Sequence, residues 1–157
     1  MRHTVRTTAG PMVVPSPEHE WTVLLFITEP GIGERLPALA GCTAGLCSAR
    51  DAARTFARYG ALVLGVGAQT PDRLAAFTES HGLGFAMVGD SDLSLGRALG
   101  VPETRDAGRP LFARAAVVLD RSGRVRSPVH QVPDPDRHAE VALAALAEAA
   151  DEGPAGR

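Results

Sequence analysis

Three mainly apolar runs dominate the hydrophobic pattern of the chain. They cover residues 21–28, 61–67 and 112–119. Runs of this length without strict polar alternation are typical of strands that are covered on both faces of a sheet. The pattern therefore predicts three central strands, with a shorter fourth strand over residues 85–88.

Between these runs the apolar positions take on the period of a helix. The spacing predicts one helix over residues 42–59, which Gly60 ends in the C′ position. Its predicted buried stripe consists of Leu46, Ala49, Ala53 and Phe56. A second helix is expected from Thr70, as N-cap, and Pro71, as first helical residue, to about His81, where Gly82 stops it. Its inward side chains are expected to be Leu74, Phe77 and Ala75.

The remaining segments complete a single α/β unit. A small hairpin is expected between residues 5–7 and 12–14, a loop over 29–40, and a short helix that ends at Leu99. Residues 101–110 are expected to be a loop, and 124–129 to pair antiparallel with the strand 112–119. A closing helix spans 136–150, with Val141, Leu143 and Leu146 as its apolar positions, before a fraying tail over 151–157. This order predicts a central mixed sheet flanked by helices, in a single domain over residues 1–157.

Composition narrows the function classes. The chain of 157 residues is 45% hydrophobic and 22% charged, which is ordinary for a soluble globular domain. A net charge of −2 without a dense basic cluster argues against nucleic acid as a partner. The apolar run 23–27 is too short to cross a bilayer, and residues 1–6 lack the apolar core of a signal peptide. We therefore expect a cytoplasmic protein without a membrane partner.

The only two cysteines, Cys42 and Cys47, lie five positions apart at the start of the first predicted helix. On a regular helix this spacing separates the two Cα atoms by roughly 8–9 Å, whereas a disulfide requires roughly 4.4–6.8 Å. The pair can therefore bond only if the first helical turn unwinds. Gly45 lies between them and lowers the cost of unwinding, because glycine weakens a helix interior by about 1 kcal/mol relative to alanine. The alternative is two unrelated buried cysteines, and close helix packing is an alternative reason for Gly45.

A helix N-terminus that follows a central strand is a suitable place for a reactive thiol. Free backbone N–H groups there stabilise an anion, and a thiolate is an anion. Cys42 is therefore the better candidate for the nucleophile, and Cys47, one turn deeper beside Leu46, for its partner. In open α/β sheets, sites lie beyond the carboxyl ends of the strands, where this helix begins.

The segment Gly41-Cys42-Thr43-Ala44-Gly45-Leu46-Cys47-Ser48-Ala49-Arg50-Asp51 resembles the peroxiredoxin family (the AhpC/TSA superfamily) in its bacterioferritin-comigratory, or Q-type, branch. The resemblance extends over roughly residues 20–147. It includes residues 63–67 with Pro71, the segment from Asp90 to Val101, and the strand and turn from Arg114 to Gly123. It implies a thioredoxin-like fold.

The resemblance also implies roles for single residues. Cys42 matches the peroxidatic cysteine, whose thiolate attacks the peroxide O–O bond, and Cys47 matches the resolving cysteine, which forms a disulfide with it. Arg114 matches the arginine that lies near the thiolate and polarises the peroxide. Thr43 and Gly41 are the candidate substrate contacts. The implied partners are a peroxide, such as hydrogen peroxide or an organic hydroperoxide, and a thioredoxin-type reductant or small thiol, with no cofactor and no metal. A monomer or weak homodimer is expected.

The chain departs from the family motif upstream of Cys42. The motif has proline and threonine where this chain has Arg35 and Leu39, and glutamate where it has Gly45. The loop over residues 29–41 is also longer than the family's. Two alternatives to a peroxidase therefore stay open: an enzyme on the same scaffold recruited to a different reaction in specialised metabolism, and a non-enzymatic redox sensor or partner-binding module.

Other residues are weaker candidates for a metal site, an acid–base group or a nucleotide-binding loop. The histidines show no metal-ligand spacing with the cysteines; they are His3, His19, His81, His130 and His138. Glu29 and Glu34 are interpreted as solvated loop charges. Residues 31–33 lack the third glycine of a nucleotide-binding loop.

Overall fold

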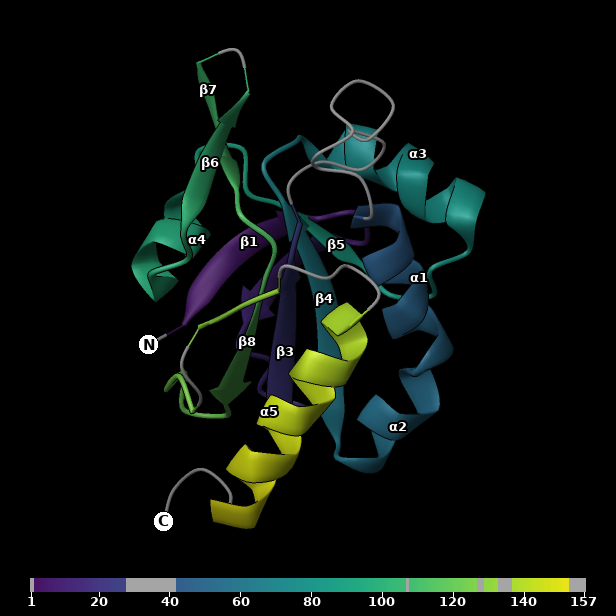
Figure 1. The fold of residues 1–157 in the computed structure, drawn as a ribbon, viewed down its shortest axis with the longest axis vertical. Coiled ribbons are helices and arrows are strands. Elements are labelled where there is room, and N and C mark those ends of the chain that lie inside the picture. Colours follow the sequence, from purple (N-terminus) through teal and green to yellow (C-terminus); the bar gives the residue numbers. More distant parts are fainter. Residues whose placement is uncertain (1, 28–41, 107, 127–128, 133–136, 153–157) are drawn as a thin grey trace.

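The computed structural model describes residues 2–27, 42–106, 108–126, 129–132 and 137–152. A seven-stranded mixed sheet with the order β2-β1-β5-β4-β3-β8-β9 forms its centre (Figure 1). The strands are β1 (His3–Thr7), β2 (Gly10–Val14), β3 (Trp21–Phe26), β4 (Ala61–Gly67), β5 (Met87–Gly89), β8 (Ala115–Asp120) and β9 (His130–Gln131). The expected central mixed sheet flanked by helices is confirmed.

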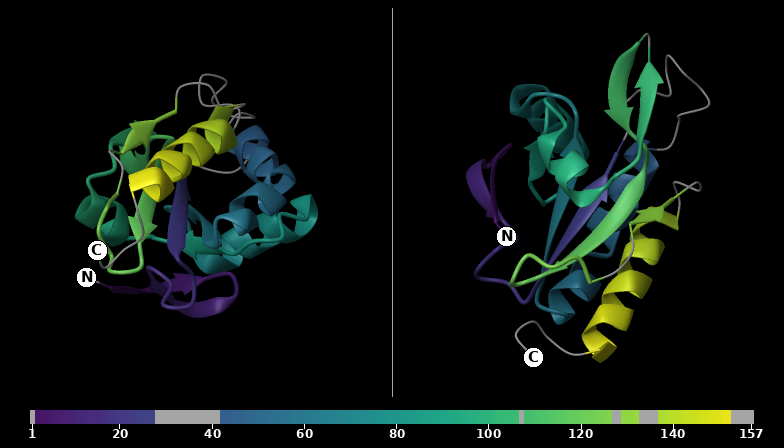
Figure 2. Two further views of the ribbon diagram at one scale, coloured as in Figure 1. Left: turned by 90° about the horizontal axis from the view of Figure 1, so that it is seen from below. Right: turned by 90° about the vertical axis from the view of Figure 1, so that its left-hand side faces the viewer.

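Within the described ranges, five helices surround this sheet: α1 (Cys42–Asp51), α2 (Ala53–Arg58), α3 (Pro71–His81), α4 (Ser94–Leu99) and α5 (His138–Glu152). Helices α1, α2 and α5 cover one face, whereas α4 and the β1–β2 hairpin lie on the other (Figure 2). Alternate residues of β3 serve the two layers, since Trp21, Val23 and Leu25 pack with the first group and Leu24 and Phe26 with the second. All six residues of β3 are buried, as its apolar run predicts.

The neighbours of β3 set the geometry of the sheet edge. β4 runs parallel to β3 and pairs Val66 with Phe26, whereas β8 runs antiparallel and pairs Ala115 with the same residue. The carboxyl ends of β3 and β4 and the start of β8 therefore meet at one edge. Residue 114, directly before β8, lies at this edge.

Strand β4 has the predicted bounds, but its first three residues are only half-buried. The cause is the short strand β5, which pairs with β4 only from Gly65 to Gly67. Residues 61–64 thus have β3 as a neighbour on one side and no β5 residue on the other.

The first predicted helix begins at Cys42 as expected, but it is two helices. Ala52, with φ −92° and ψ 9°, departs from helical geometry and separates α1 from α2. This break takes Ala53 out of the predicted buried stripe, so Ala53 is exposed while Leu46, Ala49 and Phe56 are buried. Gly60 follows the end of α2 with φ 69°, in the predicted C′ position.

The predicted loop over residues 101–110 is wrong. It contains β6 (Glu103–Asp106), which forms an antiparallel hairpin with β7 (Arg109–Phe112). The chain thus leaves β7 at Phe112 and enters β8 only at Ala115, so the predicted strand over 112–119 is two strands. The hairpin was not predicted because β6 is polar. Where one face of a strand is solvated, polar residues interrupt the apolar pattern that would indicate a strand.

Two further expectations need correction. The partner of β8 after the Asp120 turn is a bridge between Leu119 and Val125 followed by β9, and not a strand over 124–129. The buried face of α5 is formed mainly by alanines, with Leu146, whereas Val141 and Leu143 are only half-buried. Small side chains allow α5 to lie close to the sheet.

Several other expectations are confirmed. The N-terminal hairpin pairs Val5 with Met12, and α3 has Thr70 as N-cap, Pro71 in its first turn and Gly82 in the left-handed conformation at its end. The short helix α4 ends at Leu99. The predicted loop 29–40 lies outside the described residues. Within the described part of the chain, no helix is both long and apolar enough to cross a membrane.

Candidate functional site at the carboxyl edge of the sheet

The candidate residues come from elements that meet at the carboxyl edge of β3 and β4. Helices α1 and α2 run back from this edge, since the chain passes from Cys42 through α1 and α2 to Gly60, whose carbonyl accepts hydrogen bonds from residues at the start of β3 (Figure 1). Cys42 is thus the first residue of α1, where free backbone N–H groups are available. The side chains of Cys42 and Thr43 lie outside the described part, as does Gly41 entirely.

Cys47 lies in the interior of α1 and carries a free, partly buried thiol. It packs against a cluster that includes Leu46, Leu74 and Leu83. Cys42 and Cys47 belong to one continuous α-helix. The geometric argument from the sequence therefore holds for this conformation: a bond between the two sulfurs requires α1 to unwind.

Arg114 is half-buried and lies between β7 and β8, not within a strand. Its Nη1 donates a hydrogen bond to the carbonyl oxygen of Val132 at 3.2 Å, and the Val132 N–H donates to the Arg114 carbonyl at 3.0 Å. Main chain and side chain of Arg114 are thus both tied to the segment after β9. Arg114 thus stands directly before β8, at the carboxyl edge of β3.

His138, the first residue of α5, was missed as a site residue. Its side chain is fully buried, and its Nε2 lies 2.9 Å from the carbonyl oxygen of Ala115, the residue after Arg114. Burial, together with the nearby charge of Arg114, lowers the pKa of His138 from 6.5 to about 4, although the hydrogen bond to Ala115 acts in the opposite direction. The sequence offered no signal for His138 beyond its place near the start of the predicted helix over residues 136–150.

Gln69 is a second residue that sequence reasoning missed. It follows the carboxyl end of β4 and is 7% exposed, and neither atom of its amide has a hydrogen-bond partner among the described residues. The side chain lies over Gly67, since a Cβ atom at Gly67 would stand 2.7 Å from Gln69 Oε1 and 3.7 Å from Ile27 Cγ1. The glycine therefore leaves room for a buried amide at this edge. Its position directly after a buried strand was the signal available in the sequence.

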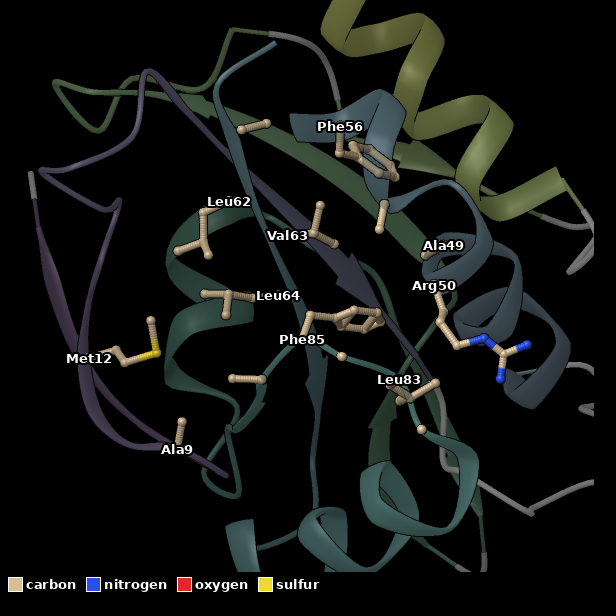
Figure 3. A pocket seen from close by; sticks show the side chains of 15 residues that line it. Ala9, Met12, Ala49, Arg50, Phe56, Leu62, Val63, Leu64, Leu83 and Phe85 are labelled. Carbon is tan, nitrogen blue, oxygen red and sulfur yellow. The ribbon is translucent and has the colours of Figure 1, made fainter. Parts of the chain in front are cut away.

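A pocket of about 480 Å³ lies elsewhere on the molecule (Figure 3). It is lined by the first half of β4, by Met12 of the hairpin, and by Ala49 and Phe56 of α1 and α2. Neither Cys47 nor Arg114 lines it, so it is separate from the carboxyl edge. Leu83 and Phe85 connect the two regions, because they line the pocket and belong to the group of side chains around Cys47.

Within the described residues, no group of three or more histidine, cysteine, aspartate or glutamate side chains could hold a metal ion. Asp90, at the end of β5, is engaged in structure: its carboxylate accepts hydrogen bonds from the backbone N–H groups of Leu95 and Gly96 at the start of α4.

Comparison with known proteins agrees with this arrangement. The model of the AhpC/TSA family matches residues 17–127, and this chain belongs to that family. It is 30% identical over 103 residues to the chloroplastic peroxiredoxin Q of Gentiana triflora, covering 66% of this chain and 46% of the plant protein. It is 28% identical over 103 residues to peroxiredoxin Bcp of Bacillus subtilis, covering 64% of this chain and 66% of the bacterial protein. The chain spans about half the length of the plant relatives that it matches.

Solved structures show the same fold. A structure of the bacterioferritin comigratory protein of Xanthomonas campestris aligns with a TM-score of 0.77 at 24% identity, covering 94% of this chain and 92% of the other. Peroxidoxin BcpB of Mycobacterium tuberculosis aligns with a TM-score of 0.76 at 24% identity, covering 94% and 93%. The expected thioredoxin-like fold is confirmed, as is the resemblance from which it was inferred.

Proposed function

We propose that this protein is a thiol-dependent peroxidase that reduces hydrogen peroxide or an organic hydroperoxide at Cys42. The observation that supports this most is the position of Cys42 as the first residue of α1, with Arg114 at the same sheet edge. A helix N-terminus and a guanidinium both favour the thiolate, which is the reactive form of cysteine. Membership of the AhpC/TSA family supports the same assignment.

The proposed first step breaks the peroxide O–O bond. The Cys42 thiolate attacks one oxygen and becomes a sulfenic acid, while the other oxygen leaves as water or an alcohol after taking up a proton. Arg114 stabilises the negative charge that develops on the two oxygens. Thr43 and the backbone of Gly41 are proposed to contact the peroxide, in place of the threonine that Leu39 replaces.

The second step forms an intramolecular disulfide. The Cys47 thiol attacks the sulfenic sulfur of Cys42, an S–S bond forms, and water leaves. This step requires α1 to unwind, since both cysteines are part of it. The packing of Cys47 beside Leu46 and Leu74 stabilises the intact helix. The rate of disulfide formation therefore depends on how easily α1 unwinds.

An external thiol must then return the disulfide to two thiols. We propose a thioredoxin-type dithiol or a small thiol for this role, which is itself oxidised to a disulfide in the exchange. This requirement fits a reducing, cytoplasmic location. We propose a monomer or weak homodimer as the working form.

Intact-mass measurement tests the proposal. The reduced wild-type protein and Cys47→Ser are each treated with one equivalent of hydrogen peroxide. The wild type is expected to lose two hydrogens as the disulfide forms, and Cys47→Ser to gain one oxygen as the sulfenic acid persists. Cys42→Ser is the matched control and is expected to keep its mass in the same time.

Turnover is measured separately, as peroxide consumption with a dithiol in excess. Repeated turnover supports an enzyme. Both thiols remaining free after peroxide treatment would contradict the proposal, as would an unchanged rate of peroxide consumption in Cys42→Ser.

A further inference from the structure

His138 is the most deeply buried titratable group near the candidate site that the proposed mechanism does not use. It is 0% exposed and stands where α5 meets β8. The helix is held in place along its length by Ala142, Ala145 and Leu146, which pack with residues of β3 and β8. The position of His138 is thus set by a rigid element and not by a loop.

The contact with Ala115 defines the tautomer of His138. A carbonyl oxygen can only accept a hydrogen bond, so Nε2 carries the proton and donates it to Ala115. Nδ1 then holds a lone pair, and this buried atom has no hydrogen-bond partner among the described residues. Leaving such an atom unpaired costs roughly 1–3 kcal/mol. A purely structural role would be served as well by an apolar residue without this cost.

The hydrogen bond acts on the residue beside Arg114. Ala115 is the first residue of β8 and pairs with Phe26 at the end of β3. Arg114 is therefore held from two sides: by Val132 through its own Nη1 and carbonyl, and by α5 through the carbonyl of Ala115. Among the described residues, Arg114 is also the charged group whose electrostatic interaction lowers the pKa of His138. A neutral ring is favoured here, because a protonated one would place a buried cation within the field of the half-buried Arg114 guanidinium.

We propose that His138 is a positioning residue for Arg114: its Nε2–H fixes the start of β8, so that the guanidinium stays at the sheet edge where α1 begins. The catalytic part of this inference rests on the proposed peroxidase function. The structural part, that His138 orders the Arg114 side chain, does not.

The test compares two substitutions that differ in the donor. His138→Gln keeps an N–H at the same number of bonds from Cα as Nε2, whereas His138→Leu fills similar space without a donor. Leu146→Val is the matched control, since it weakens the packing of the same helix away from Arg114. If His138→Leu does not fold, His138→Asn replaces it, because the asparagine side chain is too short for its N–H to reach the carbonyl of Ala115.

Three quantities are measured on the reduced proteins: the rate of Cys42 oxidation by hydrogen peroxide, the rate of Cys42 alkylation by iodoacetamide, and NMR relaxation of the Arg114 Nε–H. We expect His138→Leu to lower the peroxide rate at least tenfold, the order of loss that follows displacement of a catalytic group. The alkylation rate should fall less than the peroxide rate, because alkylation depends on the thiolate that Arg114 favours but needs no oriented peroxide. The Arg114 Nε–H should become more mobile, and His138→Gln should restore all three values.

The Arg114→Gln background gives a further check. If His138 acts through Arg114, His138→Leu has no additional effect on the peroxide rate in that background. A lower melting temperature in His138→Leu with unchanged peroxide rate and unchanged Arg114 mobility, the pattern expected of Leu146→Val, would overturn the inference. A wild type that is inert to peroxide would overturn the proposed function, and the Arg114 relaxation would still decide whether His138 orders that side chain.

Discussion

Lowering the pH from about 7 to 4.5 is expected to remove stability that depends on the neutral ring of His138. In the folded protein the pKa of His138 is lowered to about 4, against 6.5 for the free side chain, because the ring is buried and lies near Arg114. Between these two values the unfolded chain binds a proton that the folded protein excludes. This contribution is fully present above pH 6.5 and declines as the pH falls toward 4.

The size of the effect follows from the shift in pKa. Each pKa unit is worth about 1.4 kcal/mol, so the change from 6.5 to about 4 corresponds to roughly 3 kcal/mol of stability. Most of this should be lost at pH 4.5. Since small proteins are stable by only about 5–15 kcal/mol, the loss is a large fraction of the total.

Urea unfolding at several pH values between 4.5 and 7.5 measures this effect, with His138→Gln as the reference. The glutamine side chain of this variant does not titrate, so the difference between the two proteins isolates His138 from the other histidines. The wild type should lose roughly 3 kcal/mol more than the variant over this range. Parallel stability curves for the two proteins would refute the reasoning, because they would mean that His138 titrates alike in the folded and unfolded states.

Four other perturbations should give distinct results. Gly45→Ala should stabilise α1 by about 1 kcal/mol and slow disulfide formation about fivefold in stopped-flow measurements, leaving the first peroxide step unchanged; equal slowing of both steps would contradict this. Asp120→Asn should cost about 1–3 kcal/mol in urea unfolding at pH 7, because the carboxylate accepts bonds from Ser122, Arg124 and Arg126. These bonds outweigh burial and lower the pKa of Asp120, so the wild-type advantage should vanish as the pH falls below about 3.8. Gln69→Met should raise the melting temperature, since it removes a buried amide without a hydrogen-bond partner among the described residues. A lower melting temperature would indicate that the amide does form hydrogen bonds. Gly96→Ala should cost about 1–3 kcal/mol in the same assay, because a Cβ atom there would overlap the Phe112 ring, and full stability would show that the ring can move aside.

The parts of the fold that follow from continuous apolar runs were predictable from the sequence. Strand β4 has its predicted bounds. Strand β3 begins at the predicted Trp21 but ends at Phe26, although Ile27 belonged to the predicted run. All six residues of β3 are buried, as expected of an apolar run that is covered on both faces. Helix α3 was predictable at both ends, since Pro71 and Gly82 have strong local preferences. These elements depend on local chemistry and burial, which a sequence displays directly.

Other elements depend on neighbours that the sequence does not display. The β6–β7 hairpin is polar on much of its length, so no apolar period reveals it. The buried alanine face of α5 could not be recognised from the sequence, because alanine is common on both buried and exposed helix surfaces. No proline or glycine marks the break at Ala52.

The candidate site divides in the same way. The cysteine pair and Arg114 could be proposed from a motif, and the start of α1 at Cys42 was predictable from the spacing. His138 and Gln69 could not be proposed with a role, because their significance lies in what their buried polar atoms contact or lack. Such information arises only when β8, α5 and the end of β4 are placed in space.

The break at Ala52 has a consequence for the energetics of opening. It divides the segment between β3 and β4 into a helix that carries both cysteines and a helix that is anchored by the buried Phe56. Hydrogen exchange should therefore report α1 and α2 as two units that open separately. Opening α1 takes Leu46 and Ala49 out of buried clusters, but it leaves Phe56 of α2 in place. A helix that ran unbroken to Arg58 would couple each opening at Cys42 to the core around Phe56.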